Sequence, residues 1–288
     1  MEPAQLERTP FADLDAMPPD MLAMLVAALE GMSRHPEIRR VRQTAWDALR
    51  PAPGQCLLDA GCGAGDVARD LAAAVAPGGE VVALDYSAAT LAAARRRHDG
   101  GAIRYLTGNV SALDLPDDSF DGVWCERVLQ HVDDADAAIG ELIRVTKPGG
   151  RVCLLDTDWG SLAFDGVDAE LAQSVVAHMH GRLTPRQCDM GRTLRRRLVG
   201  RGLAEVTATP VTCFFPDPAS AGVVLPMLNP QVSQESWMTP DGLRERWFEQ
   251  VDRAGADGEF LAVLTIWVVT GTVQPRSATA PADSPHSS

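Results

Sequence analysis

The chain is poor in lysine, in aromatic residues and in long apolar runs. Of its 26 basic residues only Lys147 is a lysine, and the formal net charge is −13. Proteins that bind a nucleic-acid backbone need a concentrated basic surface, so this charge argues against a nucleic-acid partner. The longest apolar segment, residues 260–272, is shorter than the ~20 residues that span a bilayer. We therefore expect a soluble protein that does not insert into membranes.

The six cysteines include no C-x-x-C pair. The ligand spacing of a zinc site is therefore absent, and we expect no metal. Cys56, Cys125 and Cys153 lie in apolar runs, where cysteine behaves as a small hydrophobic residue. The first twenty residues are acidic and interrupted by proline, unlike a signal peptide. These features predict reduced thiols and a cytoplasmic location.

Short apolar runs alternate with helical segments between residues 55 and 156. This alternation is typical of parallel β-α-β units, with helices on both faces of a doubly wound sheet. Ligands of such α/β sheets bind at the carboxyl ends of the strands. We expect strands at 55–59, 80–85, 103–106, 120–125 and 151–156, and helices at 66–75, 88–98 and 133–145.

The regions on either side of this core predict one domain with a helical lid. Residues 1–50 form an N-terminal lid with two amphipathic helical stretches, and residues 51–160 form the ligand-binding core. Residues 161–274 supply capping helices near 168–181 and 190–200 and two further strands at 206–215 and 263–273. Residues 275–288 are small, polar and rich in proline, which predicts a disordered tail.

The strongest local motif is the run from Leu57 to Asp66, in which a strand leads into three alternate glycines and then a helix. Glycines there permit positive φ and allow a ligand to approach the backbone. The third glycine comes one position too early for the dinucleotide motif G-x-G-x-x-G. Asp66 would also repel a pyrophosphate at the helix N-terminus. With Asp59 nearby, the motif favours a ligand with a cationic group, although a ligand-free turn is the alternative.

Asp85 ends the next expected strand, twenty residues beyond Gly65. A carboxylate at that place suits hydrogen bonds to the hydroxyls of a ribose. Taken alone, Asp85 has a helix cap as its alternative role. The glycine motif upstream makes the ribose interpretation the stronger one.

Four motifs follow one another in order: D-x-G-x-G-x-G at 59–65, the acid at 85, G-N-V-S-A-L-D-L-P at 108–116 and K-P-G-G at 147–150. In this order they resemble the class I S-adenosylmethionine-dependent methyltransferases, most closely the ubiquinone/menaquinone-biosynthesis type, over residues 50–160. The resemblance implies a Rossmann-like seven-stranded, mostly parallel sheet with its last strand antiparallel. It also implies S-adenosyl-L-methionine as cofactor.

The resemblance assigns the cofactor site residue by residue. The methionine end is held by Asp59, Gly61, Cys62, Gly63 and Gly65, the ribose by Asp85, and the adenine by Tyr86, Asn109 and Val110, while Glu126 and Arg127 flank the methionine moiety. Asn109 departs from the family, which commonly has aspartate there. An asparagine carbonyl can still accept from the adenine amino group.

Four residues are candidates for the acceptor side. His131 falls where the family often places a histidine. It is either a general base, a polar wall, a cap of the helix at 133–145 or a partner of a backbone group. Period-2 alternation puts Asp158 on the same face as Asp156, where it would deprotonate an acceptor, bind a cationic amine or cap the next turn. Trp159 is either an aromatic wall near the sulfonium or core filler. His180 is a candidate substrate contact.

The resemblance implies methyl transfer to an oxygen, nitrogen or carbon of a small hydrophobic acceptor, in secondary metabolism or quinone-like biosynthesis. The alternative is a non-methylating cyclase or small-molecule binding protein that keeps the same fold, since fold does not prove activity. A nucleic-acid methyltransferase is disfavoured by charge and by C-E-R-V at 125–128. The acceptor atom and the oligomeric state, a homodimer included, stay open.

Overall fold

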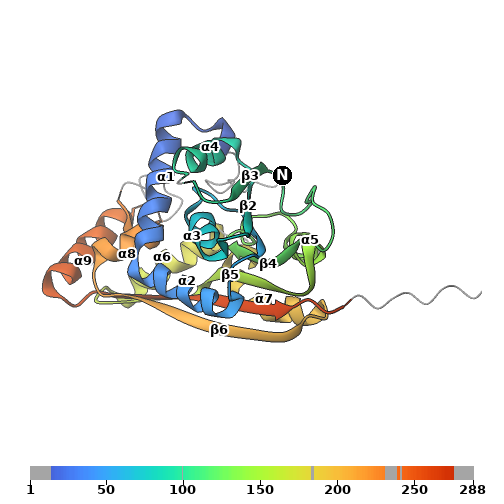
Figure 1. Cartoon of the computed structure of the whole chain (residues 1–288). Coiled ribbons are helices and arrows are strands. Elements are labelled where there is room, and N and C mark those ends of the chain that lie inside the picture. Colours follow the sequence, from blue (N-terminus) through green and yellow to red (C-terminus); the bar gives the residue numbers. More distant parts are fainter. Residues whose placement is uncertain (1–13, 99, 183–184, 231–238, 241, 276–288) are drawn as a thin grey trace, which may run out of the picture.

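The computed structural model describes residues 14–98, 100–182, 185–230, 239–240 and 242–275. A seven-stranded sheet with the strand order β3-β2-β1-β4-β5-β7-β6 forms its centre (Figure 1). The strands are β1 (Cys56–Ala60), β2 (Glu80–Asp85), β3 (Ile103–Thr107), β4 (Phe120–Glu126), β5 (Thr146–Asp165), β6 (Ala204–Phe215) and β7 (Leu261–Thr272). Strands β1 to β5 pair in parallel, whereas β7 runs antiparallel to both β5 and β6. The predicted fold class is confirmed.

Helices cover both faces of this sheet. They are η1 (Leu14–Ala16), α1 (Pro19–Arg34), α2 (Pro36–Leu49), α3 (Asp66–Val75), α4 (Ala88–Arg96), α5 (Ala135–Val145), α6 (Ala169–Arg182), α7 (Pro185–Gly200), α8 (Pro218–Val224), η2 (Pro226–Leu228) and α9 (Arg244–Asp257). One buried apolar cluster joins α2, α3, α6, α8 and α9 to the sheet, and a second joins α5 and α7 to the other face. Each strand alternates between the two clusters, as Leu57 and Leu58 do in β1.

Side-chain caps set where several helices begin. Ser87 accepts from the backbone N of Thr90 at 3.1 Å and starts α4, as the sequence predicts. Asp134 accepts from Ala137 N at 2.8 Å and starts α5. These side chains satisfy backbone donors that have no partner inside the helix.

Strand β5 is the main departure from the sequence prediction. It runs over 20 residues, whereas the local apolar run indicated only 151–156. It pairs antiparallel with β7 from Arg151 opposite Thr272 to Asp165 opposite Leu261. Because the partner strand comes from a distant part of the chain, no local pattern predicts that β5 continues beyond residue 156. Asp156 and Asp158 therefore lie inside a strand, while the parallel pairing with β4 stops at Leu155.

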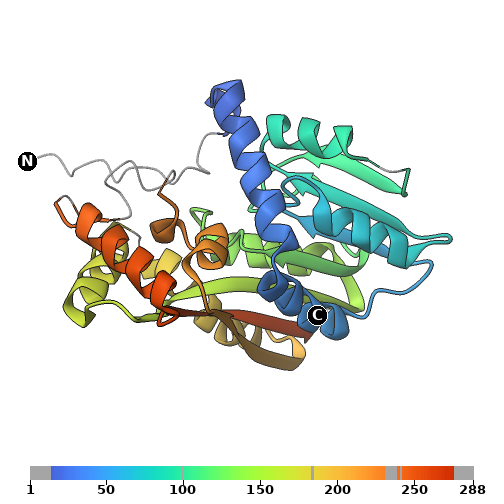
Figure 2. The same ribbon diagram turned by 90° about the vertical axis from the view of Figure 1, so that its left-hand side faces the viewer.

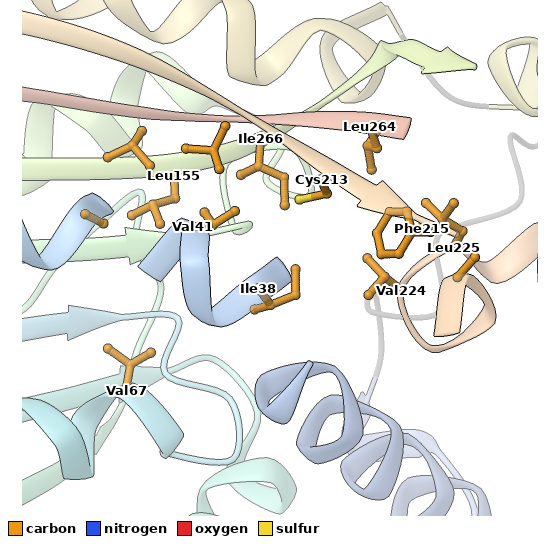
Figure 3. Packing of buried hydrophobic residues seen from close by; sticks show 14 of the residues in the cluster. Ile38, Val41, Val67, Leu155, Cys213, Phe215, Val224, Leu225, Leu264 and Ile266 are labelled. Atoms are coloured by element: carbon orange, nitrogen blue, oxygen red, sulfur yellow. The ribbon is translucent and has the colours of Figure 1, made fainter. Parts of the chain in front are cut away.

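The two helices of the expected N-terminal lid behave differently. Helix α2 buries Ile38 and Val41 in the cluster that also holds Phe215 and Ile266, so it packs as part of the core (Figure 3). Helix α1 has no buried residue, and it lies between α4 and α8 (Figure 2). Its Met24 is 65% exposed. The division into lid, core and cap stays a prediction, and the expected disordered tail falls almost wholly outside the described residues.

Within the described part of the chain, no helix is long and apolar enough to cross a membrane. The six cysteines carry free thiols. Burial raises the pKa of several of these thiols, among them Cys56 and Cys213. They therefore pack as neutral small side chains rather than as thiolates.

Candidate functional site

The glycine turn lies at the carboxyl end of β1, at the edge where α/β sheets bind ligands. Gly61, Gly63 and Gly65 all have positive φ, of 78°, 52° and 76°. A Cβ on Gly61 would lie 2.2 Å from Val128 Cγ2, whereas a Cβ on Gly63 would meet nothing within 4 Å. Gly61 is therefore needed for packing, and Gly63 leaves open space beside the backbone. Asp66 pairs with Arg69 and Arg97, which weakens the repulsion argued from the sequence.

Asp59 is a buried acid without a complete set of partners. Its side chain is 3% exposed, and its Oδ2 has no hydrogen-bond partner among the described residues. Burial and the negative charge of Glu126 raise the pKa of Asp59 to about 8. An unsatisfied buried carboxyl group is costly, and a cationic ligand donor would remove that cost.

Asp85, at the end of β2, holds the glycine turn in place. Its Oδ2 accepts from Gly63 N at 2.9 Å and its Oδ1 accepts from Ser87 N at 3.0 Å. Burial raises the pKa of Asp85. Ser87, and not Asp85, is the N-cap of α4, so the helix-cap alternative for Asp85 is wrong. Each carboxylate oxygen keeps a further lone pair for a ribose hydroxyl.

The predicted adenine contacts surround the next strand ends. Tyr86 is 45% exposed and Val110 is buried. Asn109 is exposed, and its Oδ1 accepts from Ser111 N at 2.9 Å. The Asn109 side chain thus shapes its own turn while leaving its amide NH₂ group as a donor.

Two arginines meet the carboxylate of Glu126, the last residue of β4. Arg42, from α2, donates from Nε to Glu126 Oε2 at 2.8 Å, and Arg127 NH2 lies 3.2 Å from Glu126 Oε1. Burial would raise the pKa of Glu126, but the two guanidinium groups hold it below its ordinary value. The sequence missed Arg42, because nothing distinguishes it from the other arginines of its helix.

His131 lies just past the carboxyl end of β4. Its backbone N donates to Val128 O at 2.8 Å. Reduced contact with bulk water and the positive charge of Arg127 lower the pKa of His131, so its imidazole is neutral near pH 7. Asp134, not His131, caps α5.

Asp158 is held on both oxygens. Arg192 Nε donates to its Oδ1 and Oδ2 at 2.8 and 2.9 Å, and Trp267 Nε1 donates to Oδ2 at 3.2 Å. This pairing does not favour the base role that the sequence suggested for Asp158. Asp156 is fully buried and accepts from Gln130 N at 3.2 Å, and burial raises its pKa to about 7.

The two predicted substrate-binding residues lie together. Trp159 Nε1 donates to Gln130 Oε1 at 2.9 Å, and His180 Nε2 lies 3.1 Å from the backbone oxygen of Trp159. Since a carbonyl only accepts, Nε2 of His180 carries the hydrogen and Nδ1 is the acceptor. The sequence missed Gln130, which links the loop after β4 to β5.

These residues fit the cofactor of the resembling family. An orphaned acid oxygen on Asp59 suits an ammonium group, the open Gly63 admits a close ligand, and Asp85 stands where a ribose would lie. Among the described residues, the remaining cofactor candidates gather at the same edge, after β2, β3 and β4. The candidate site is thus polar at Asp59 and Asp85 and apolar at Val110.

Comparisons with known proteins agree with this geometry. Residues 58–154 match a family model described as "Methyltransferase domain". Over 87% of its length the chain is 33% identical to an uncharacterised 37.1 kDa protein of transposon TN4556 from Streptomyces fradiae, covering 72% of that protein. It is 37% identical to the demethylmenaquinone methyltransferase of Renibacterium salmoninarum, over 42% of this chain and 48% of that enzyme. The chain thus spans about half the length of the named methyltransferase.

A solved structure shows the same fold. Phosphoethanolamine N-methyltransferase 2 of Haemonchus contortus, in complex with phosphomonomethylethanolamine and S-adenosylhomocysteine, superposes with a TM-score of 0.52 at 20% identity. The match covers 82% of this chain and 53% of that one. With the glycine turn, the two acids at the ends of β1 and β2 and the family match over them, the chain belongs to the class I S-adenosylmethionine-dependent methyltransferases.

Proposed function

We propose that the chain transfers a methyl group from S-adenosyl-L-methionine to a small, hydrophobic organic acceptor. The observation that carries this proposal is the buried Asp59 Oδ2, which lacks a partner beside a glycine turn with open space at Gly63. An acid in this state favours a ligand that brings a positive charge. The relative named demethylmenaquinone methyltransferase supports a quinone-like ring or a secondary metabolite as acceptor.

The cofactor, when bound, supplies a methyl group already activated on a sulfonium. The protein then has to align acceptor and methyl and to exclude water. Asp59 and the backbone at 61–65 would hold the methionine end, and Asp85 the ribose. Val110 supplies an apolar wall for the adenine, and Trp159, fixed by Gln130, supplies one near the acceptor.

An oxygen acceptor needs a base to take its proton, and His131 suits this role better than Asp158. The His131 imidazole is neutral near pH 7, which is the form in which an imidazole accepts a proton. Asp158 accepts four hydrogen bonds from these neighbours, three from Arg192 and one from Trp267. A stabilised carbanion acceptor would need no such base.

The net charge of −13 supports a small-molecule partner rather than nucleic acid. Free thiols at the six cysteines support a cytoplasmic location.

Titration calorimetry with S-adenosylmethionine and S-adenosylhomocysteine, with NAD as control, tests the cofactor assignment. We expect micromolar binding of both adenosyl ligands and none of NAD. Transfer is then followed with a labelled methyl group on a panel of phenols, quinols and amines. Absence of binding to the folded protein would contradict the cofactor assignment. Binding without transfer to any acceptor would favour the non-methylating alternative.

A further inference from the structure

Arg127 lies at the centre of the carboxyl edge of the sheet, between β4 and β5. Its backbone N donates to Leu155 O at 2.7 Å, and its φ is 54°. A non-glycine residue in the left-handed region is uncommon, and such residues concentrate at functional sites. The local backbone therefore holds Arg127 in one place at the point where strands β4 and β5 separate.

The charge of Arg127 is incompletely balanced. Among the described residues its ion pair is with Glu126 at 3.2 Å, but that carboxylate is shared with Arg42, which is closer at 2.8 Å. The Nε of Arg127 is buried without a hydrogen-bond partner. The remaining contact of the guanidinium is with the sulfur of Met32 on α1, which is a weak acceptor.

The nearby acids do little to complete this balance. Burial raises the pKa of Asp156 to about 7, so it is only partly ionised at neutral pH. The guanidinium groups of Arg42 and Arg127 therefore share one fully ionised carboxylate, that of Glu126. A buried cation with an unsatisfied donor is costly unless an anion completes its shell.

The position of Arg127 favours the acceptor as the source of that anion. Three hydrogen bonds join the loop that begins at Arg127 to β5. Arg127 N donates to Leu155 O at 2.7 Å, Gln130 N donates to Asp156 Oδ2 at 3.2 Å, and Trp159 Nε1 donates to Gln130 Oε1 at 2.9 Å. Asp59 marks the methionine end of the cofactor in the proposed function. The resemblance placed Arg127 beside the methionine moiety, but these bonds place its loop against β5, the strand that also carries Asp158 and Trp159. The side chain of Arg127 is 19% exposed.

We infer that the methyl acceptor carries a carboxylate and that Arg127 binds it. A planar guanidinium matches a carboxylate in bidentate geometry, and the buried Nε supplies one of the two donors. The inference rests on the proposed function, since it names the chemistry of the acceptor in that same site. It narrows the acceptor from any hydrophobic ring to an aromatic or alkyl acid.

The experiment compares benzoate with benzamide, its neutral counterpart, on protein saturated with S-adenosylhomocysteine. We expect calorimetry to show benzoate binding at least about tenfold more tightly, the scale of one charge-assisted hydrogen bond. Arg127→Gln should abolish that preference and Arg127→Lys should retain part of it. Arg195→Gln, a change on the exposed face of α7, is the matched control and should leave the preference unchanged.

Equal binding of the two probes by the wild-type protein, or weak binding of both, would overturn the inference without needing any variant. It would also be overturned if Arg127→Gln weakened S-adenosylhomocysteine tenfold but spared methylthioadenosine, because the arginine would then serve the cofactor carboxylate. If S-adenosylhomocysteine fails to bind the wild-type protein, the proposed function fails instead. The benzoate titration without it then still tests Arg127.

Discussion

Arg192 on α7 holds Asp158 on β5 through both carboxylate oxygens, with Nε at 2.8 and 2.9 Å. The two residues are 34 positions apart in the sequence. Asp158 is 6% exposed and Arg192 is 44% exposed, so the pair lies at the boundary between the sheet and solvent. It joins a capping helix to the strand that carries the acceptor candidates.

Removing the cation should leave a buried acid poorly paired. We expect Arg192→Met to lower the free energy of unfolding by ~1–3 kcal/mol, because Asp158 keeps only its bond from Trp267. Urea unfolding measures the change, with Arg195→Met as the surface control. Asp158→Asn in the Arg192→Met background should recover part of the loss. A variant with unchanged stability would show that the pair contributes nothing measurable.

Cofactor binding should be linked to the ionisation of Asp59. With its pKa at about 8, Asp59 is mostly protonated at pH 7 in the free protein. A cationic ligand favours the charged form, so binding should release close to one proton and tighten as pH rises from 6 to 7.

Calorimetry in phosphate and in Tris buffer measures the number of protons released on binding. The two buffers differ in ionisation enthalpy, so the apparent binding enthalpies differ in proportion to that number. Asp59→Asn is expected to remove both the proton release and the pH dependence. The prediction fails if the wild-type protein releases no proton.

Asp85 should contribute to affinity both through the ligand and through the glycine turn. We expect Asp85→Ala to weaken S-adenosylmethionine binding by ~1–3 kcal/mol, since a charged acceptor for two backbone donors and the ribose is lost. Asp85→Asn keeps one acceptor oxygen and should lose less. Titration calorimetry measures both. Unchanged affinity in folded Asp85→Ala would defeat the ribose assignment.

Alanine substitutions at Gly61 and Gly63 should have different effects, the first mainly on stability and the second mainly on cofactor binding. Gly61→Ala places a Cβ 2.2 Å from Val128 Cγ2, so it should cost ~1–3 kcal/mol of stability through overpacking. Gly63→Ala meets no protein atom within 4 Å, and the left-handed backbone alone should cost about 1 kcal/mol.

The main effect of Gly63→Ala should instead be a loss of cofactor affinity, because its new methyl group enters the space that the ligand would occupy. Thermal unfolding and calorimetry on both variants give the comparison. Equal affinities in the two variants would show that Gly63 does not face the ligand.

Stability should fall in mild acid through His35. Its Nδ1 accepts from Glu37 N at 3.2 Å at the start of α2, and its Nε2 lies 2.8 Å from Ser220 Oγ. Burial lowers its pKa below 6.5, although Glu37 and Asp217 oppose the shift. The unfolded chain then binds more protons below pH 6.5, so the free energy of unfolding decreases as pH falls below that value.

The matched variant is His35→Asn, which keeps an N-cap acceptor and cannot titrate. Urea unfolding at pH 7.5 and 5.5 should show a smaller loss in the variant than in the wild-type protein. An equal loss in both proteins would assign the acid sensitivity to other groups.

The parts of the fold that depend on neighbouring residues could be predicted from sequence. Helix α3 begins at Asp66 because the glycines before it turn the chain. Ser87 caps α4 because its side chain accepts from the backbone N of Thr90, three residues further along the chain. The site at the carboxyl edge follows from the same local patterns, since Asp59 and Asp85 each end a buried run.

Contacts between residues that are far apart in the sequence depend on the tertiary structure. The length of β5, the sharing of Glu126 between Arg42 and Arg127, and the pairing of Asp158 with Arg192 each join segments far apart in the chain. An arginine on a helix has many carboxylates it could pair with, and no periodicity selects one. Packing selects the pair, because a buried charge is stable only beside the group that neutralises it.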